Sequence, residues 1–182
     1  AATLEPLANS VHATLKANPA AGETAMVFGA GIIGLGVIQC LRNLDLNIGK
    51  ILAVDVSDKR LEIAKRLGAD EVINASRDDP FQKAMEVAGA EPFYLSPEAS
   101  MPMVDIVYDC VGYIQDRPEP PVLQQAMLIA RSKTGRIVAH GVFEAPLTMD
   151  FSILVGKQVQ VIGSYGCNPE DTAIGIELMR TK

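Results

Sequence analysis

The sequence predicts an α/β protein with a doubly wound, parallel six-stranded sheet and helices on both of its faces. Short apolar, β-branched runs alternate with segments of about 10–15 residues that have helical periodicity, which is typical of βαβ units. The expected strands form two groups of three, which is the two-half plan of doubly wound folds. A glycine-rich turn joins the first strand of the sheet to the helix that follows it.

The first half of the chain predicts three strands, each followed by a helix, after a mostly helical segment at residues 1–20. Apolar residues at steps of four, four and three indicate the first of these helices. Ser57 is expected to cap the second, which Gly68 ends, and Asp79 with Pro80 is expected to open the third. The expected strands are Thr24–Phe28, Ile51–Asp55 and Glu71–Asn74, and the helices cover residues 33–44, 57–67 and 80–87.

The second half begins after Gly89–Pro102, a segment whose three prolines and lost periodicity predict a loop. Pro118, Pro120 and Pro121 precede the next expected helix. A last helix begins at Asn168-Pro169, with Ile174, Leu178 and Met179 expected to face inward. The expected strands are Val104–Asp109, Arg136–His140 and Val159–Ser164, and the first of the two helices covers Val122–Arg131.

The composition excludes several classes of protein. With 182 residues, 48% hydrophobic and 21% charged, the chain is long and apolar enough to bury a core, so disorder is excluded. The net charge of −6 and the absence of a basic stripe argue against nucleic acid and against an anionic membrane surface. No apolar run of about 18 residues and no leader pattern is present, so neither a membrane span nor a secretion signal is expected.

The three cysteines, Cys40, Cys110 and Cys167, are odd in number and widely spaced. A disulfide framework or a four-cysteine zinc site is therefore not expected, and a reducing cytoplasm fits best. The two histidines, His12 and His140, add too few ligands for a self-contained metal enzyme. This shortage raises the question of whether the chain is a whole protein.

The strongest motif is G-x-G-x-x-G at Gly29, Gly31 and Gly34, between an expected strand and an expected helix. Gly29 permits a tight turn, Gly31 lets a pyrophosphate approach the backbone, and Gly34 lets the helix pack on the strand. Amides near Ile32 and Ile33 then face the phosphates with the positive end of the helix dipole. The alternative is an ordinary glycine turn with a structural role only.

Asp55 ends the second expected strand, 21 residues after Gly34, where a dinucleotide-binding fold carries an acid. Its carboxylate can accept both ribose hydroxyl hydrogens and would repel a 2′-phosphate, so NAD is favoured over NADP. The alternative role for Asp55 is to cap the next helix. Arg60 lies one turn into that helix, where it either covers the adenosine or is simply solvated.

Two further segments are expected at the same crevice, because ligands lie beyond the carboxyl ends of parallel strands. Cys110, Val111 and Gly112 follow the fourth strand, and His140, Gly141 and Val142 follow the fifth. Cys110 is expected to pack as a small apolar group. For His140 the options are an acid–base role and, preferred here, a loop position that offers its backbone to the nicotinamide.

Several segments together resemble the cofactor domain of zinc-type medium-chain dehydrogenases, most closely the polyol, threonine and secondary-alcohol branches. They are Glu5-Pro6-Leu7 with His12-Ala13, AGETAMVFGAGIIG, AVDVSDKRLEIAKRLGADEVIN, DCVG and FSILVGKQVQVIGSYG. The resemblance covers nearly the whole chain. It departs from the usual pattern at the long, proline-rich stretch Gly89–Pro102 and at RPEPP, residues 117–121.

The resemblance implies a role for each matching residue. Gly29, Gly31 and Gly34 would bind the pyrophosphate, Asp55 the adenosine ribose, and Arg60 would flank it. Val111 would lie on the adenine side and Ile33 behind the nicotinamide ring. Gly141, Val142, Ile162 and Gly163 match positions near the nicotinamide.

The family also implies a zinc site to which Glu5 contributes, as a ligand in some branches and as an outer carboxylate in others. A catalytic zinc needs three protein ligands and an open position, and the other family ligands come from a preceding catalytic, GroES-like domain. We therefore expect residues 1–182 to be one dinucleotide-binding domain, with zinc in the parent enzyme only. For Glu5 an ordinary charge at a helix start is equally open, and His12 is expected to be a helix residue rather than a ligand.

The expected parent is an NAD-dependent oxidoreductase that moves hydride between NAD and a small alcohol or polyol, with zinc as Lewis acid in the family mechanism. This chain alone is expected to bind cofactor without turnover. The alternatives are a stand-alone regulatory nucleotide-binding module, a zinc-free quinone-reductase-like enzyme that uses NADPH, and a methyltransferase. A homo-oligomer through the edge strand Val159–Ser164 is also expected from the family.

Overall fold

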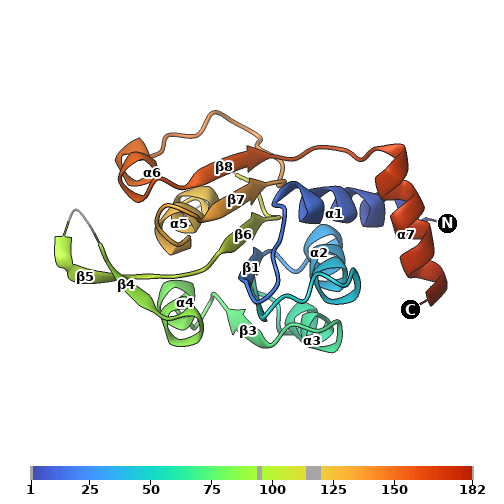
Figure 1. The fold of residues 1–182 in the computed structure, drawn as a ribbon, viewed down its shortest axis with the longest axis horizontal. Helices are drawn as coiled ribbons and strands as arrows, with labels where there is room; N and C mark the ends of the chain where they lie inside the picture. Colours follow the sequence, from blue (N-terminus) through green and yellow to red (C-terminus); the bar gives the residue numbers. More distant parts are fainter. Residues whose placement is uncertain (1, 94–95, 114–119, 182) are drawn as a thin grey trace.

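The computed structural model describes residues 2–93, 96–113 and 120–181. Six parallel strands form the main sheet, in the order β3-β2-β1-β6-β7-β8. This order is that of a doubly wound sheet, which confirms the predicted fold class (Figure 1). The strands are β1 (Thr24–Phe28), β2 (Lys50–Asp55), β3 (Glu71–Asn74), β6 (Ile106–Asp109), β7 (Arg136–Ala139) and β8 (Gln160–Gly163).

Helices cover both faces of this sheet. One face packs on α1 (Leu4–Lys16), α2 (Ile32–Asn43) and α3 (Asp58–Arg66), and the other on α4 (Pro80–Ala88), α5 (Val122–Ile129) and α6 (Phe151–Lys157). The last helix, α7 (Pro169–Thr181), lies beside α1 (Figure 1).

Strand β1 shows why its sequence reads as an unbroken apolar run. Ala25 and Val27 belong to the core under α1–α3, whereas Met26 and Phe28 belong to the core under α4–α6. Because successive side chains of a strand point to opposite faces, a strand covered on both sides must be apolar at every position.

Of the two predicted N-cap residues, only Asp79 makes a capping hydrogen bond. Asp79 caps α4 as expected, because its Oδ1 accepts from the Phe81 amide at 2.9 Å. Ser57 occupies the N-cap position of α3, but its side chain makes no capping hydrogen bond. Gly68 has a φ of +111°, in the region that favours glycine, and follows the end of α3 as predicted.

The prediction of a loop over Gly89–Pro102 is wrong. Strands β4 (Ala90–Phe93) and β5 (Ser96–Pro102) pair antiparallel as a separate two-stranded sheet, which projects at one end of the molecule (Figure 1). Prolines are tolerated there because an edge strand can leave one row of its backbone groups unpaired. Residues 94 and 95, within the predicted loop, lie outside the described residues.

Smaller differences concern the second half of the chain. Helix α6 was not predicted; Asp150 caps it by accepting from the Ser152 amide at 2.9 Å. Leu178 is buried as expected and Ile174 is partly buried, but Met179 is 44% exposed, so its predicted inward position is wrong. Pro118 and most of the RPEPP stretch lie outside the described residues.

Candidate functional site

The glycine turn after β1 has the geometry that the motif predicts. Gly29 has a φ of +87°, and a Cβ at Gly34 would lie 1.8 Å from the Gly29 carbonyl oxygen. A Cβ at Gly31, by contrast, would meet no atom within 4 Å. Gly29 and Gly34 are therefore required by the fold itself, whereas the missing side chain of Gly31 leaves open space beside the backbone.

Helix α2 begins directly at this open space. Gly31 is its N-cap residue, no side chain caps it, and its first turn contains no acidic residue. The first amide groups of a helix have no partners within the helix, and they carry the positive end of its dipole. The amides around Ile32 and Ile33 can therefore bind an anion such as a phosphate.

Asp55, at the end of β2, lies against the same turn. It is 8% exposed. Its Oδ2 accepts from the Ala30 amide at 2.8 Å, and its Oδ1 accepts from the Ser57 amide at 2.9 Å. Each carboxylate oxygen accepts one amide and retains a further lone pair, so both oxygens can still receive a hydroxyl hydrogen.

Arg60 is the cation nearest to this carboxylate among the described ion pairs. Its Nη1 lies 3.6 Å from Asp55 Oδ2, and the Arg60 side chain is 57% exposed. The Asp55 carboxylate therefore has an exposed positive group beside it.

A cavity of about 310 Å³ joins these groups. Of the predicted site residues, Gly29, Gly31, Asp55, Arg60, Cys110 and Val111 line it. Residues that the sequence did not single out complete the lining: Phe28, Val54, Val56, Ala75, Val122 and Gln125. The apolar walls and one carboxylate suit a flat, apolar ring attached to a sugar.

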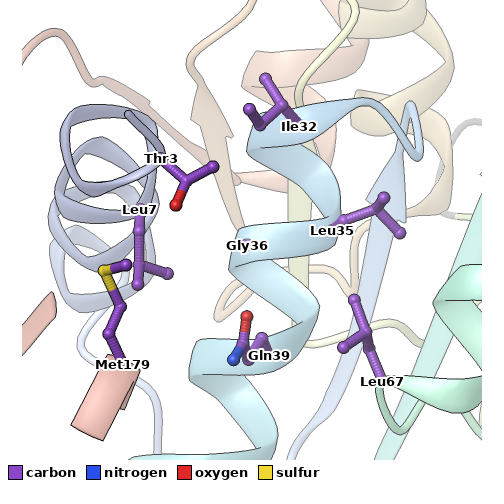
Figure 2. Close-up of a pocket in the computed structure, with 8 residues that line it drawn as sticks. All are labelled: Thr3, Leu7, Ile32, Leu35, Gly36, Gln39, Leu67 and Met179. Carbon is purple, nitrogen blue, oxygen red and sulfur yellow. The ribbon is translucent and has the colours of Figure 1, made fainter. Parts of the chain in front are cut away.

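A second cavity, of about 280 Å³, lies between α1, α2 and α7 (Figure 2). Thr3, just before α1, Leu7 of α1 and Met179 of α7 flank α2 there, and the exposed Ile32 side chain lies at its upper end (Figure 2). None of its lining residues is charged. It therefore offers no carboxylate to accept ribose hydroxyls, and the cavity lined by Asp55 is the better candidate for a nucleotide.

Cys110 packs as predicted. Burial, helped by the nearby Asp109 carboxylate, raises the pKa of the Cys110 thiol well above its usual range. The thiol therefore stays protonated, which argues against a nucleophilic role.

The remaining predicted residues lie outside the 310 Å³ cavity. Gly112 and Gly141 pack together, since a Cβ at Gly141 would lie 1.9 Å from the Gly112 nitrogen. Val142 is 74% exposed, Ile162 is partly buried, and Gly163 has open space where a Cβ would point. Ile33 is partly buried and packs against the core under α1–α3.

His140 is half-buried at the carboxyl end of β7. Its Nδ1 lies 3.0 Å from the Ser164 hydroxyl. Burial lowers the pKa of His140, His12 lowers it further, and Glu5 opposes the shift. His140 is therefore neutral at neutral pH, and its backbone amide already donates to the Asp109 carbonyl at 3.0 Å.

His12 and Glu5 occupy helix α1. His12 Nδ1 pairs with the buried Asp171 carboxylate at 2.7 Å, which ties α1 to α7. This pairing explains His12 as a structural helix residue, as predicted. Glu5 is exposed, and its Oε1 accepts from the Asn9 side chain at 2.7 Å.

Known proteins similar to this chain include dehydrogenases. The zinc-binding dehydrogenase family matches residues 33–181. The L-threonine 3-dehydrogenase of Bacillus velezensis is 30% identical over 165 residues, which are 89% of this chain and 42% of that protein. Sorbitol dehydrogenase of Arabidopsis thaliana is 29% identical over 168 residues, covering 90% of this chain and 41% of that protein.

Solved structures agree in fold. The short chain alcohol dehydrogenase rspB of Escherichia coli CFT073, complexed with the cofactor NADH, has a TM-score of 0.75 at 25% identity. The match covers 97% of this chain and 46% of that one. The 2R,3R-butanediol dehydrogenase of Bacillus subtilis has a TM-score of 0.76 at 26% identity, covering 98% and 45%. This chain thus spans less than half the length of each of these four proteins.

Proposed function

The chain belongs to the zinc-binding dehydrogenase family, and on that premise we propose that it is the nucleotide-binding domain of an NAD-dependent dehydrogenase. The observation that carries the proposal is the hydrogen bond from the Ala30 amide to Asp55. This bond supports the proposal because it holds a carboxylate that could accept ribose hydroxyls beside the glycine turn, where the amides at the start of α2 could bind a pyrophosphate.

The proposed cofactor position follows from the chemistry of each group. The pyrophosphate lies against Gly31 and the amides of Ile32 and Ile33, and the adenosine ribose binds Asp55 with Arg60 beside it. The adenine enters the apolar cavity next to Val111. The nicotinamide extends towards Gly141, Val142, Ile162 and Gly163, with Ile33 behind the ring.

Bound NAD supplies the hydride acceptor, and this chain's residues bind and orient it. The Asp55 carboxylate favours NAD over NADP because a 2′-phosphate would bring a second negative charge to the same ribose. Arg60 approaches Asp55, so its charge is partly neutralised by that carboxylate.

The described residues do not form a zinc site by themselves. Among them, no three side chains of His, Cys, Asp or Glu come together as metal ligands. Glu5 supplies at most one ligand, whereas a catalytic zinc takes three. We propose that Glu5 contributes in the whole enzyme, with the other ligands in a catalytic domain of the GroES-like kind, and that residues 1–182 form the cofactor domain.

The substrate class is proposed from the relatives. The similar proteins include enzymes named for L-threonine and sorbitol, both small molecules with a secondary alcohol. We propose that the whole protein oxidises a small alcohol or polyol and that this domain alone binds cofactor without turnover.

Strand β8 lies at one edge of the main sheet. The outer edge of β8 is unpaired in the sheet, and Val161 there is 39% exposed. Phe151 and Val155 of α6 are 57% and 68% exposed. Such an apolar edge favours a second copy of the chain, so we propose a homo-oligomer through β8.

No helix in the described part of the chain is both long and apolar enough to cross a bilayer. The three cysteines are all free thiols. We propose a reducing compartment, the cytoplasm, on the basis of the thiols.

The proposal is tested by amide NMR of the chain titrated with NADH and, in parallel, with S-adenosylmethionine. NADH should shift the amides of Gly29–Gly34 and of Val111, whereas S-adenosylmethionine, which has no pyrophosphate, should leave the glycine turn unshifted. Shifts confined to other surfaces, or a stronger response to S-adenosylmethionine, would contradict it.

A further inference from the structure

We propose that Asp109 is a positioning residue that fixes two turns of the cofactor crevice, the turn at residues 110–112 on the adenine side and the turn at 140–142 near the nicotinamide. It is the last residue of β6, in register with Phe28 of β1 and Ala139 of β7. The inference rests on the proposed cofactor site and gives a role to a residue that lies outside the G-x-G-x-x-G motif.

The side chain of Asp109 holds the first turn. Its Oδ1 accepts from the Val111 amide at 3.0 Å and from the Gly112 amide at 2.9 Å. An Asp that binds amides two and three residues ahead closes an Asx-type turn. Gly112, with a φ of +79°, completes the turn in a conformation that side chains rarely adopt.

The backbone of Asp109 holds the second turn. Its carbonyl oxygen accepts from the His140 amide at 3.0 Å and from the Gly141 amide at 2.8 Å. One residue therefore binds four amides, two from each turn. The two turns also touch, because a Cβ at Gly112 would lie 2.0 Å from the Val142 carbonyl oxygen and the Tyr113 amide donates to that oxygen at 3.0 Å.

The glycine turn after β1 rests on the same assembly. A Cβ at Gly29 would lie 2.8 Å from a methyl carbon of Val111 and 3.2 Å from the Cys110 backbone. A displacement of residues 110–112 would therefore reach both the pyrophosphate turn and the turn at 140–142. The Asp109 side chain holds the central one of these three contacting turns.

The buried carboxyl group of Asp109 is costly in itself, so its value lies in the amides that it binds. Asp109 is fully buried, and its Oδ2 has no hydrogen-bond partner among the described residues. Burial raises its pKa. Burying an unpaired carboxyl group is costly, and an asparagine would offer the same Oδ1 acceptor without a charge. What the site requires is an acceptor of this reach, which Asp and Asn share and Ala lacks.

The experiment compares Asp109→Asn, Asp109→Ser and Asp109→Ala with the unaltered chain, by NADH calorimetry and by amide hydrogen exchange without NADH. The matched control is Asp105→Ala. Asp105, directly before the first residue of the same strand, is also buried, and its Oδ2 accepts from the Thr24 amide at 2.9 Å. This control separates loss of stability from loss of the turns.

We expect Asp109→Ala to weaken NADH binding by about tenfold or more and to speed exchange at residues 111, 112, 140 and 141 together. The dissociation constants for NADH of Asp109→Asn and of Asp105→Ala should both stay within about threefold of that of the unaltered chain. Asp109→Ser, a weaker turn former, should fall between Asn and Ala, and it keeps the test open if the alanine variant does not fold.

Unchanged NADH affinity in a folded Asp109→Ala or Asp109→Ser variant would overturn the proposal. A loss of NADH affinity in Asp109→Asn as large as that in Asp109→Ala would overturn it as well. If the unaltered chain itself bound no NADH, the proposed function would fail. The exchange rates of the two turns would still decide the role of Asp109.

Discussion

The Oδ2 atom of Asp55 accepts a hydrogen bond of 2.8 Å from the backbone amide of Ala30. The bond joins the end of β2 to the turn between β1 and α2, and so couples the proposed ribose acceptor to the proposed phosphate-binding turn. Replacing Asp55 should therefore affect both halves of the nucleotide site.

Replacing Asp55 with alanine should weaken NADH binding by about ten- to a hundredfold, because hydrogen bonds to a charged group contribute about 1.5–3 kcal/mol. The affinity for NADPH should fall much less, since the repulsion between Asp55 and the 2′-phosphate disappears as well. The ratio of the two dissociation constants, measured by calorimetry, is the readout.

Asp70→Ala is the matched control for this change. Its carboxylate accepts from the Ile51 amide at 2.7 Å, near the other end of β2 and away from the cavity. An unchanged preference for NADH over NADPH in Asp55→Ala would remove the role assigned to Asp55.

Alanine at Gly31 and alanine at Gly34 should have opposite effects. The Gly31 Cβ would enter open space, so that variant should fold with an almost unchanged Tm and yet bind NADH about tenfold or more weakly. The Gly34 Cβ would lie 1.8 Å from the Gly29 carbonyl oxygen, so that variant should lose stability first. Thermal unfolding and NADH titration of both variants separate the two effects; full NADH affinity in Gly31→Ala would place the pyrophosphate elsewhere.

Lys157 gives the fold a specific dependence on pH. It is buried, and its Nζ donates to the Leu128 carbonyl at 2.5 Å. Burial lowers the pKa of Lys157 from 10.5 to about 8, against the opposing charge of Glu91. Between about pH 8 and 10.5 the unfolded chain therefore binds more protons at this residue than the folded chain, so stability should rise with pH across that window.

The measurement is urea unfolding at several pH values for the unaltered chain and for Lys157→Met. The difference in the free energy of unfolding between them should change by on the order of 2 kcal/mol in favour of the lysine from pH 8 to pH 10. Parallel pH profiles for the two proteins would show that Lys157 keeps an ordinary pKa.

A lysine at Val161 should prevent the proposed pairing of β8 edges, because like charges would face each other across the new strand pair. In size-exclusion chromatography with light scattering, the mass of the unaltered chain should exceed the monomer mass of 19.4 kDa. The mass of the Val161→Lys variant should equal that of the monomer. Glu62→Lys, an exposed change on α3, is the control. A monomeric unaltered chain at high concentration would contradict the proposed oligomer.

The sequence predicts the sheet well where local pattern and burial agree. Strands β1 and β3 begin and end at the expected residues, since turns or helix signals bound each apolar run. The hairpin β4–β5 escaped prediction because its prolines normally indicate a loop, and its pairing depends on contacts between residues up to 12 positions apart. Helix α6 has only seven residues, too few to show a period clearly.

Sequence motifs predict part of the lining of the candidate site. Gly29, Gly31, Gly34 and Asp55 are singled out by their spacing along the chain. Ala75, Val122 and Gln125 also line the cavity, but they come from separate elements and carry no chemical signature. Asp109 did have one: an Asp two and three residues before the amides of a turn that ends in glycine indicates an Asx-type turn.

The most direct test of the central claim is calorimetric titration of the unaltered chain with NADH and with NADPH under identical conditions. We predict one saturable site per chain for NADH, with a dissociation constant at least about tenfold lower than for NADPH, because Asp55 accepts the ribose hydroxyls and repels a 2′-phosphate. No saturable heat with NADH, or tighter binding of NADPH, would contradict the account.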